Sequence, residues 1–456
     1  MDYWICRVAM GNIDTTEEAH DGVTRRSFMQ SVAAGTGLLL STPAWAQVEP
    51  GNTDELRIAM IGPGSQGRNL LTKCLKIPGI RFAAVCDVWP YHLRYAANIL
   101  KKYDQTVNTY IDFREMLNRE KDLDAVIVAT PDWVHAEQTI ACLQAGIHVY
   151  CEKEMSHTVE GCRRMVQAAK ETGKLLQIGH QRRSNPRYWH AIQLIHKDKL
   201  LGRITHVYGQ WNRAKRYDLG WPKGEELDQE TLKKNGYSTM DEFRNWRWYR
   251  KYSGGPMADL GSHQVDIFNW ILQDRPTSVM AGGGADYYKD REWYDNVMAI
   301  YEYGARGQVV RGFYQVLNTT SHGGFFETFM GDQGSMVVSE DPRKGFVFRE
   351  LDAKRREWED EAKKVETLGR DAIELKIGET LAPDGNRTPE AERMLAEIQK
   401  PVHQLHLENF FRAIRDGTRL SCPAEIAFET AVSVLAANEA VAKRQPVCLK
   451  PEDFRV

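Results

Sequence analysis

Three ionisable side chains, Lys153, Asp259 and His263, have the chemical types that acid–base chemistry at a hydroxyl group requires. Removing a hydride from a secondary alcohol needs a base that takes the hydroxyl proton at the same time. An imidazole titrates near neutral pH, so we expect His263 to be that base. Asp259 and His263 are four residues apart and share one face of a helix, where the carboxylate orients the imidazole or binds substrate.

Each of these residues also has a structural interpretation. Lys153 has two acidic neighbours, Glu152 and Glu154, with which it could form a surface ion pair. Asp259 could cap a helix and His263 could be a core histidine, or the two could be metal ligands. The residue types alone leave these interpretations open.

A glycine-rich segment lies between the first β-rich stretch and the first helical one. In the G-x-G-x-x-G spacing, the first glycine allows a tight turn and the second lets the backbone approach a pyrophosphate. The third lets helix and strand pack closely, and the start of the helix faces the phosphates. Glycines alone could mark only a tight turn. The residues expected to hold a dinucleotide are Gly62, Gly64, Ser65, Gln66 and Gly67.

Asp87 ends the second β-rich stretch, twenty residues after Gly67. A carboxylate in this position accepts hydrogen bonds from the hydroxyls of an adenosine ribose. It also repels a 2′-phosphate, so we predict NAD(H) in preference to NADP(H). A helix N-cap is the alternative role for Asp87.

Residues 54–179 alternate short β-rich stretches with helical ones. This order predicts an α/β domain with a doubly wound, parallel Rossmann sheet. The expected strands are Leu56–Ile61, Arg81–Cys86, Ala125–Ala129, His148–Cys151 and Leu175–Ile178, and the expected helices are 66–76, 91–102, 113–119, 133–145 and 158–172.

Residues 180–456 show a different pattern, with longer β-branched and aromatic stretches. They predict a second α/β domain with a mostly antiparallel open sheet. Residues 350–400 are dense in charged side chains, and we expect an exposed helical excursion there. The expected strands are Ile204–Trp211, Val297–Tyr303, Gln308–Val316 and Phe325–Met330, and the expected helices are Gly261–Leu272, 403–416 and 424–442.

Several motifs together resemble the glucose–fructose oxidoreductase / inositol dehydrogenase / MocA family. They are Thr130-Pro131-Asp132 with His135, Cys151-Glu152-Lys153, Gly179-His-Gln-Arg-Arg183, Gly254-Gly-Pro-Met-Ala-Asp-Leu-Gly-Ser-His-Gln-Val-Asp266 and His406-Leu-Glu-Asn-Phe-Phe-Arg-Ala-Ile-Arg415. The resemblance implies a Rossmann domain that holds NAD(P) and a second domain that presents a sugar or polyol.

The resemblance also assigns residues. Lys153 matches the lysine of the family's Glu-Lys-Pro motif, and Asp259 and His263 match its D-x-G-x-H motif. By the same likeness, Arg183 and Asn185 are expected to face the substrate. The residues it implies at the cofactor are Thr130, Pro131, His135, Glu152 and Lys153.

Glu154 stands where the family has a proline. Proline fixes the backbone, whereas glutamate frees it and adds a charge beside Lys153. The departure therefore bears on the position of Lys153.

Residues 208–252 combine many aromatic and basic side chains. Aromatic faces pack against the C–H faces of sugar rings, and arginine binds hydroxyl and carboxylate groups. We expect Trp246 and Tyr249 to contact the substrate. A subunit interface is the alternative, because the same residue types dominate interface hot spots.

Residues 1–46 have the three parts of an export signal. A twin-arginine motif, Thr24–Met29, precedes the short apolar stretch Val32–Leu40, and Ala44-Trp45-Ala46 is a small-x-small cleavage site. The apolar stretch is shorter than the about 20 residues that span a bilayer. We predict that the twin-arginine machinery exports the folded protein to the periplasm; a buried N-terminal helix is the alternative.

The rest of the chain, about 410 residues, can bury two ordinary cores. The net charge of −2 and the pI near 6.7 argue against a nucleic-acid partner. No later apolar stretch is long enough to span a membrane. The cysteines lack C-x-x-C spacing, so we expect neither a disulfide framework nor a zinc or other metal site.

Three functions fit these observations. The first is an exported oxidoreductase with tightly held NAD(H), recycled in place, that transfers hydride to and from a sugar or glycoside carbon. The second is a redox-neutral NAD-dependent glycosidase or lyase, since the chain is similar to exported NAD-dependent N-acetylgalactosaminidases. The third is a sugar-binding module without catalysis. We expect a homo-oligomer, because an open sheet usually finds a partner surface.

Overall fold

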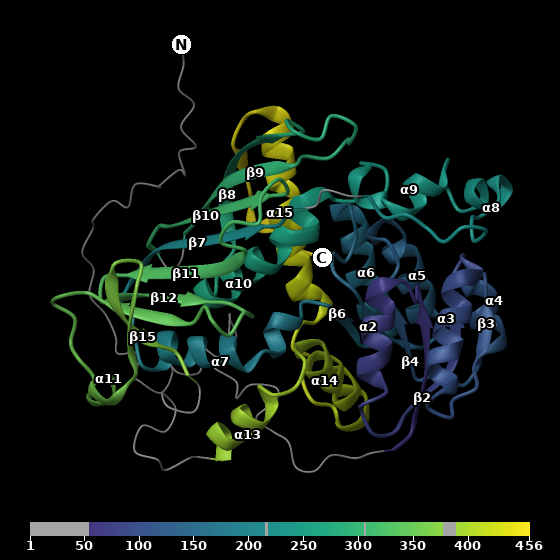
Figure 1. Cartoon of the computed structure of the whole chain (residues 1–456), viewed down its shortest axis with the longest axis horizontal. Coiled ribbons are helices and arrows are strands. Elements are labelled where there is room, and N and C mark those ends of the chain that lie inside the picture. The colour runs from purple at the N-terminus through teal and green to yellow at the C-terminus, as the bar shows by residue number, and fades with distance from the viewer. Residues whose placement is uncertain (1–53, 215–217, 305–306, 377–388) are drawn as a thin grey trace, which may run out of the picture.

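The computed structural model describes residues 54–214, 218–304, 307–376 and 389–456 (Figure 1). The predicted export signal, residues 1–46, lies outside these ranges. None of the helices in the described ranges has the length and apolar composition needed to cross a membrane.

The first domain is built on a six-stranded parallel sheet with the order β3-β2-β1-β4-β5-β6. Its core strands are apolar on both faces, as a sheet covered by two helical layers requires. The strands are β1 (Leu56–Ile61), β2 (Ile80–Cys86), β3 (Asn108–Tyr110), β4 (Ala125–Val128), β5 (His148–Cys151) and β6 (Leu176–Ile178). The helices are α2 (Ser65–Cys74), α3 (Pro90–Lys101), α4 (Phe113–Arg119), α5 (Asp132–Gln144) and α6 (Val159–Thr172). The predicted Rossmann architecture is thereby confirmed.

The carboxyl ends of the central strands lie at one edge of this sheet. Ile61, the last residue of β1, pairs with Cys86 on β2 and with Val128 on β4. The residues that follow these strands, including Gly62 and Asp87, are therefore brought together. Ligands of open parallel sheets bind at this edge.

The second domain contains a ten-stranded sheet with the order β14-β15-β13-β12-β11-β7-β10-β9-β8-β16. Strands β7 and β10 pair in parallel and all other neighbours are antiparallel, as predicted. The strands are β7 (Ile204–Asn212), β8 (Pro276–Gly284), β9 (Asn296–Tyr303), β10 (Val310–Leu317), β11 (Phe325–Gly331), β12 (Gly334–Val338), β13 (Phe346–Arg349), β14 (Lys364–Thr367), β15 (Arg370–Glu374) and β16 (Val447–Cys448).

The charged stretch 350–400 is less helical than we expected. Besides the helices α11 (Glu357–Glu361) and α13 (Pro389–Glu397), it forms β14 and β15 at the edge of the large sheet. Ala372 and Ile373 of β15 are buried although their neighbours are charged. These two apolar residues anchor a short edge hairpin to the sheet. In the sequence they are hard to recognise as part of a strand, because the residues around them are charged.

The C-terminal helices connect the two domains. Helix α15 (Ala424–Lys443) packs against β8 and α10 (Ser262–Leu272) in the second domain and against α6 in the first. Figure 1 shows it running between the two sheets. Helix α14 (Val402–Asp416) packs against α2, and its Phe410 and Phe411 enter the core of the Rossmann domain. The first domain thus includes residues from the end of the chain.

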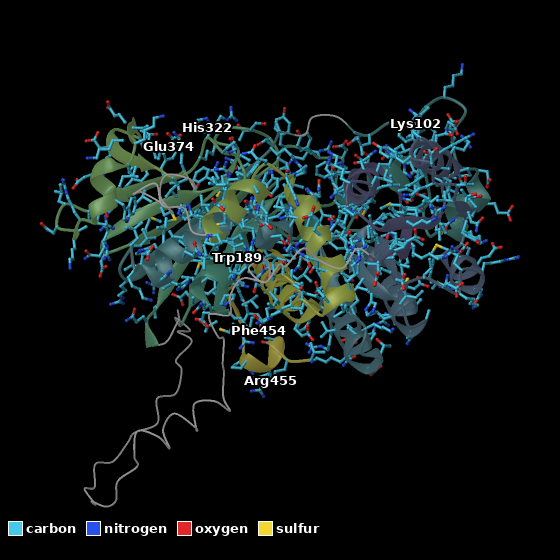
Figure 2. The ribbon with its side chains drawn as sticks, turned by 90° about the horizontal axis from the view of Figure 1, so that it is seen from below. Lys102, Trp189, His322, Glu374, Phe454 and Arg455 are labelled. Atoms are coloured by element: carbon cyan, nitrogen blue, oxygen red, sulfur yellow. The ribbon has the colours of Figure 1, made fainter. Side chains whose placement is uncertain are left out.

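The last residues lie at the middle of the molecule. Figure 2 places Phe454 there, with Lys102 at the end formed by the parallel sheet and His322 and Glu374 at the opposite end. The Phe454 side chain is buried in the core beside α6. The C-terminus therefore supports the same junction as α15.

Candidate functional site

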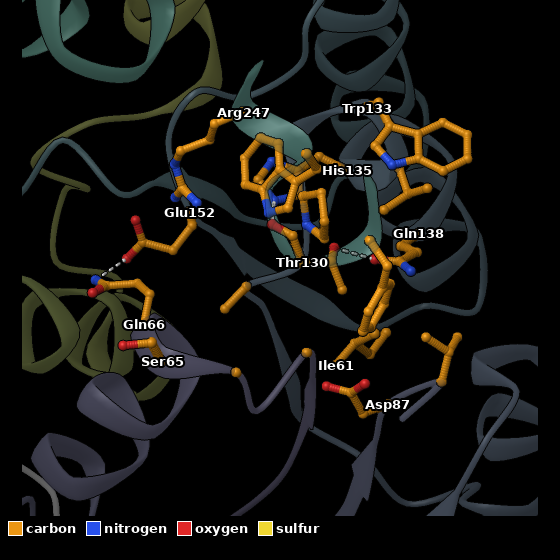
Figure 3. A pocket seen from close by; sticks show the side chains of 18 of the residues that line it. Ile61, Ser65, Gln66, Asp87, Thr130, Trp133, His135, Gln138, Glu152 and Arg247 are labelled. Atoms are coloured by element: carbon orange, nitrogen blue, oxygen red, sulfur yellow. Dashed lines mark hydrogen bonds between the residues drawn. The ribbon is translucent and has the colours of Figure 1, made fainter. Parts of the chain in front are cut away.

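A cavity of about 970 Å³ runs from the carboxyl edge of the parallel sheet to the second domain. Figure 3 shows the end of the cavity near the Rossmann domain, with Asp87 and Ser65 on one side and Arg247 on the other. Lys153, Asp259 and His263 line the same cavity. The residues predicted for cofactor and catalysis thus share one continuous space.

The glycine-rich turn has the geometry that its sequence predicts. Gly62 has a φ of +86°, and a Cβ there would lie 2.7 Å from Cγ2 of Thr130. A Cβ on Gly67 would lie 2.1 Å from the carbonyl oxygen of Gly62. At Gly64 the nearest atom to a Cβ would be Cε1 of His92, at 3.5 Å. The protein itself requires the first and third glycines, while the second leaves space at the start of α2, where a phosphate binds.

Trp89, and not Asp87, is the N-cap of α3, so the alternative role expected for Asp87 is wrong. Oδ1 of Asp87 accepts a hydrogen bond of 2.8 Å from the backbone N–H of Trp89. Its Oδ2 lies 2.9 Å from Nδ1 of His92. Both contacts fix a carboxylate that lines the cavity, where it can still accept from ribose hydroxyls.

The Thr130–Pro131 loop is held by His135. The Nδ1 and Nε2 atoms of His135 lie 2.9 Å and 2.7 Å from the carbonyl oxygens of Glu154 and Thr130. Burial lowers the pKa of His135 to about 4, so the neutral ring donates to one of the two carbonyls. Pro131 is the residue before α5, and all three residues line the cavity.

Glu152 joins the glycine-rich turn to the strand that carries Lys153. Its Oε1 accepts a hydrogen bond of 3.0 Å from Nε2 of Gln66, drawn as a dashed line in Figure 3. Since Glu152 follows β5 and Gln66 lies in the first turn of α2, this bond closes one side of the dinucleotide site.

Lys153 is bound to the second domain. Its Nζ donates to the carbonyl oxygen of Asp259 and lies 3.2 Å from Oδ1 of the same residue. Asp259 belongs to a short π-helix, Met257–Gly261, which runs directly into α10 and so replaces the start of the α-helix we expected. The peptide bond between Lys153 and Glu154 is cis.

His263 is a neutral base in this environment. Burial, and then the positive charges of Lys153 and Arg182, hold the pKa of His263 well below its usual value. Its Nδ1 is buried and has no hydrogen-bond partner in the part of the chain that the structure describes. The ring lies beside Trp211, with 5.3 Å between centroids. An unprotonated imidazole at the cavity wall can accept a proton at neutral pH.

Glu154 and Asp132 are buried behind the site, and among the described residues no cationic side chain lies within hydrogen-bond distance of either carboxylate. Oε1 of Glu154 accepts from the backbone N–H of Met155 at 2.8 Å, and Oε2 is unpaired among the described residues. Burial raises the pKa of Glu154 to about 8. Oδ2 of Asp132 accepts from the N–H of Gly254 at 3.1 Å, and burial raises its pKa to about 7.

Arg183 and Asn185, both expected at the substrate, do not line the cavity. Arg183 is buried in an ion pair, its Nε lying 2.9 Å and 2.8 Å from the two carboxylate oxygens of Asp266. Asn185 caps a helix by accepting from the N–H of Arg187 at 3.0 Å. Their family motif folds as a buried 3₁₀ turn, from which Gln181 lines the cavity instead.

The aromatic-rich segment contributes only in part. Trp246 lines the cavity as expected. Tyr249 does not, because its hydroxyl donates to Oδ2 of Asp241 at 2.7 Å and its ring packs in an aromatic cluster with Tyr252.

Among the many cavity residues that sequence reasoning did not assign to the site are four polar ones, two of them cationic. Arg213 and Arg247 each form an ion pair with Asp259. Both stood in the basic and aromatic stretch 208–252, but sequence alone did not say which of its arginines turns inward. The other two are Gln181 and Glu340. Glu340 belongs to a loop after β12 that no motif marks.

No group of three or more histidine, cysteine or acidic side chains in the described ranges is arranged to hold a metal ion. Six cysteines are buried free thiols: Cys74, Cys86, Cys142, Cys151, Cys162 and Cys422. Burial raises the pKa of each, so these thiols are inert at neutral pH.

Comparison with known proteins gives relatives of several activities. The chain is 29% identical over 223 residues to an inositol 2-dehydrogenase of Salmonella typhimurium, covering 48% of this chain and 55% of that protein. It is 25% identical over 263 residues to a 2,7-anhydro-N-acetylneuraminate hydratase of Mediterraneibacter gnavus, covering 54% and 61%. It is 29% identical over 256 residues to a glycosyl hydrolase family 109 protein of Stenotrophomonas maltophilia, covering 51% and 54%. The matched part is thus little more than half of each relative's length.

Solved structures share the fold. GenD2 from gentamicin A biosynthesis, in complex with NAD, has a TM-score of 0.63 at 17% identity and covers 88% of this chain and 99% of that one. Levoglucosan dehydrogenase in complex with NADH has a TM-score of 0.63 at 19% identity and covers 87% and 100%.

Two family models match the chain in sequence. Residues 56–180 match the NAD-binding Rossmann fold of the oxidoreductase family, and residues 227–449 match its C-terminal alpha/beta domain. Together they span most of the described residues and meet at the cavity. The chain belongs to the Gfo/Idh/MocA family of oxidoreductases.

Proposed function

We propose that this protein is an NAD(H)-dependent oxidoreductase that acts on a CH–OH group of a sugar or glycoside. One observation carries the proposal: a neutral histidine and an anchored lysine, His263 and Lys153, line the same cavity as the dinucleotide turn. Inositol 2-dehydrogenase is among the relatives, which supports an alcohol of this kind as substrate.

Each side chain at this end of the cavity has its own role in the proposed reaction. His263 takes the hydroxyl proton of the substrate and returns it in the reverse direction. The Nζ of Lys153 polarises the substrate oxygen, and Asp259 fixes that ammonium group by the 3.2 Å contact. NAD(H), when bound at the glycine-rich turn, supplies hydride chemistry. Trp211 shields His263 from water on one side.

The cofactor is held tightly and is NAD(H), not NADP(H). Asp87, fixed by Trp89 and His92, favours free ribose hydroxyls over a 2′-phosphate. The segment 219–252 of the second domain covers this half of the cavity. Its Glu225 carbonyl accepts from Nε1 of Trp89 at 2.6 Å, and its Tyr237 hydroxyl accepts from Nε1 of Trp133 at 3.0 Å. A dinucleotide under this cover leaves only when those contacts open.

Export by the twin-arginine machinery to the periplasm completes the proposal. It rests on Arg25 and Arg26 and the stretch that follows them. Outside the cytoplasm a cofactor has no free pool to exchange with, so it must be oxidised and reduced where it is bound. Tight binding under the 219–252 segment suits this requirement.

A redox-neutral reaction is the second candidate, favoured by the glycosyl hydrolase family 109 and hydratase relatives. Transient oxidation of one carbon makes the neighbouring C–H acidic and permits elimination before the carbon is reduced again. Deuterium uptake from solvent at that neighbouring carbon would favour this candidate over simple hydride transfer. A sugar-binding module without catalysis would show neither reaction.

We also propose that the protein is a homo-oligomer built on the open face of the large sheet. Met280, Met298 and Ile300 lie on the neighbouring strands β8 and β9 and are 55%, 44% and 43% exposed. Apolar side chains gathered on one sheet face are typical of a protein contact. Light scattering of wild type and of Ile300→Glu tests this: the variant should have the smaller mass.

The function itself is tested on protein purified from the periplasm. We expect it to carry NAD(H), identified by mass spectrometry after denaturation. Glycosides should change the absorbance of the bound nicotinamide. Protein without nucleotide, and without affinity for it, would disprove the proposal.

A further inference from the structure

One carboxylate in the cavity, that of Asp259, forms ion pairs with three cationic side chains. Oδ1 of Asp259 lies 3.2 Å from Nζ of Lys153 and 3.2 Å from Nε of Arg247. Oδ2 lies 3.5 Å from Nη2 of Arg213. Charged N–H···O bonds are ordinarily about 2.7–2.9 Å long, so Asp259 satisfies none of the three fully.

Each of the two arginines keeps N–H donors that have no partner among the described residues. The Nε of Arg213 is buried and has no hydrogen-bond partner among the described residues. Arg247 donates from Nε to Asp259, and its guanidinium lies over the ring of Trp246, 4.2 Å from the centroid. Stacking on an indole fixes the plane of the fork and leaves its edge free to bind a planar anion.

The other acidic residues of this part of the cavity have partners of their own. Glu152 accepts from Gln66 at 3.0 Å. Glu340 accepts from Nε of Arg182 at 3.1 Å and from Gln181 at 3.3 Å. Within the described residues, neither carboxylate forms an ion pair with Arg213 or Arg247, whose positive charges are therefore only partly neutralised by Asp259.

We infer that the sugar bound in this cavity is acidic and that Arg213 and Arg247 hold its anionic group. This inference rests on the proposed function and names the substrate class of the same site. Arg213 and Arg247 line the same cavity as Lys153 and His263. A carboxylate, phosphate or sulfate of the sugar that is held by the two arginines therefore lies within reach of the hydroxyl group from which His263 takes the proton. Trp246 and Trp211 line the same space.

The experiment compares matched substrates on the holoenzyme. The methyl glycosides of glucose and glucuronic acid differ only in the charged group, and glucose 6-phosphate and glucose 6-sulfate test the other anions. The rate at which each sugar reduces the bound nicotinamide is followed at equal concentrations. Wild type should prefer an anionic sugar over the neutral one by roughly 10- to 100-fold, the range for one or two hydrogen bonds to a charged group. The anionic sugar that reduces the nicotinamide fastest shows whether the substrate carries a carboxylate, a phosphate or a sulfate.

Variants assign the preference to residues. Arg247→Gln and Arg213→Gln should each reduce the anionic-to-neutral ratio of kcat/KM by about tenfold, because each removes one charged donor pair. Arg247→Lys keeps the charge without the fork and should restore only part of the ratio. Arg275→Gln is the matched control: Arg275 is 42% exposed and forms a 3.2 Å ion pair with Glu429 away from the cavity lining, so the ratio should stay at the wild-type value.

The outcomes separate this inference from the proposed function. Nicotinamide reduction by neutral sugars as fast as by acidic ones, unchanged in Arg247→Gln, would overturn the acidic substrate and leave the oxidoreductase intact. Nicotinamide that no sugar of either kind reduces, in protein shown to carry the nucleotide, would overturn the proposed function itself.

Discussion

The Nζ atom of Lys153 lies 3.2 Å from Oδ1 of Asp259, 106 residues further along the chain. Lys153 follows the fifth strand of the Rossmann sheet, and Asp259 stands in the π-helix that begins α10. The contact therefore joins the NAD-binding Rossmann domain to the C-terminal α/β domain. It also fixes the ammonium group in the cavity that His263 lines, close enough to help lower the pKa of that histidine.

Replacing Asp259 by Asn should weaken catalysis more than folding. Lys153 would keep the carbonyl oxygen of Asp259 as a partner and lose the carboxylate. We expect kcat to fall by roughly 10²-fold, a usual cost of misplacing a polarising group, with a change in Tm of only a few degrees. Glu429→Gln, which breaks the ion pair to Arg275, is the control for loss of a carboxylate. Equal activity of the two variants would rule out the role of Asp259.

His263→Asn should lower kcat by roughly 10²- to 10⁴-fold while NAD(H) stays bound, since general-base catalysis contributes about that much. Because burial and nearby cations hold the pKa of His263 well below its usual value, the free wild-type enzyme keeps a neutral base at neutral pH. Its kcat/KM should therefore stay level as the pH falls through the ordinary range of histidine and decline only below it. A decline centred on that ordinary range would contradict the assignment.

Two glycine substitutions in one turn should have different effects. Gly67→Ala puts a Cβ 2.1 Å from the carbonyl oxygen of Gly62, so overpacking should cost about 1–3 kcal/mol of folding free energy. Gly64→Ala meets its nearest neighbour, His92, at 3.5 Å and should fold normally while binding NAD(H) more weakly. Urea unfolding and nucleotide titration of both proteins measure the two effects. Normal folding of Gly67→Ala would show that the turn is looser than its geometry indicates.

Glu154 should make the protein less stable at high pH. Burial raises its folded pKa to about 8 from an ordinary value of 4.5, so between these values the folded state binds more protons than the unfolded state. The free energy of unfolding then falls as the pH rises through this window, by up to about 1.4 kcal/mol per pH unit for one group. Glu154→Gln should flatten the slope but not abolish it, because the pKa of Asp132 is also raised, to about 7. Identical slopes in wild type and variant would show that Glu154 is ionised in the folded protein.

The sequence contained enough to predict the Rossmann sheet, because its strands are continuous apolar stretches between clear helical patterns. It missed β3, whose three residues, Asn-Thr-Tyr, are mostly exposed and carry no apolar pattern. It also missed the hairpin of β14 and β15, whose hold on the sheet comes from Ala372 and Ile373 within a charged stretch.

The sequence predicted those site residues that stand at the end of a strand or on a helix, because the position in the element sets the direction of the side chain. Asp87, Lys153, Asp259 and His263 all reach the cavity for that reason. Side-chain direction in irregular segments was not predictable. Arg183 turns into the core to meet Asp266, while Arg213, from the same class of residue, turns towards the cavity. The choice depends on a partner distant in sequence, which composition and spacing do not show.

Transfer of deuterium from sugar to cofactor tests the central claim most directly. Purified holoenzyme is incubated with perdeuterated methyl glucoside and methyl glucuronide in ordinary water, and the nucleotide is then released and weighed by mass spectrometry. We predict one deuterium on the nicotinamide in wild type and none in His263→Asn within the same time. Nucleotide free of deuterium in wild type, after the sugar has been converted to product, would contradict the account.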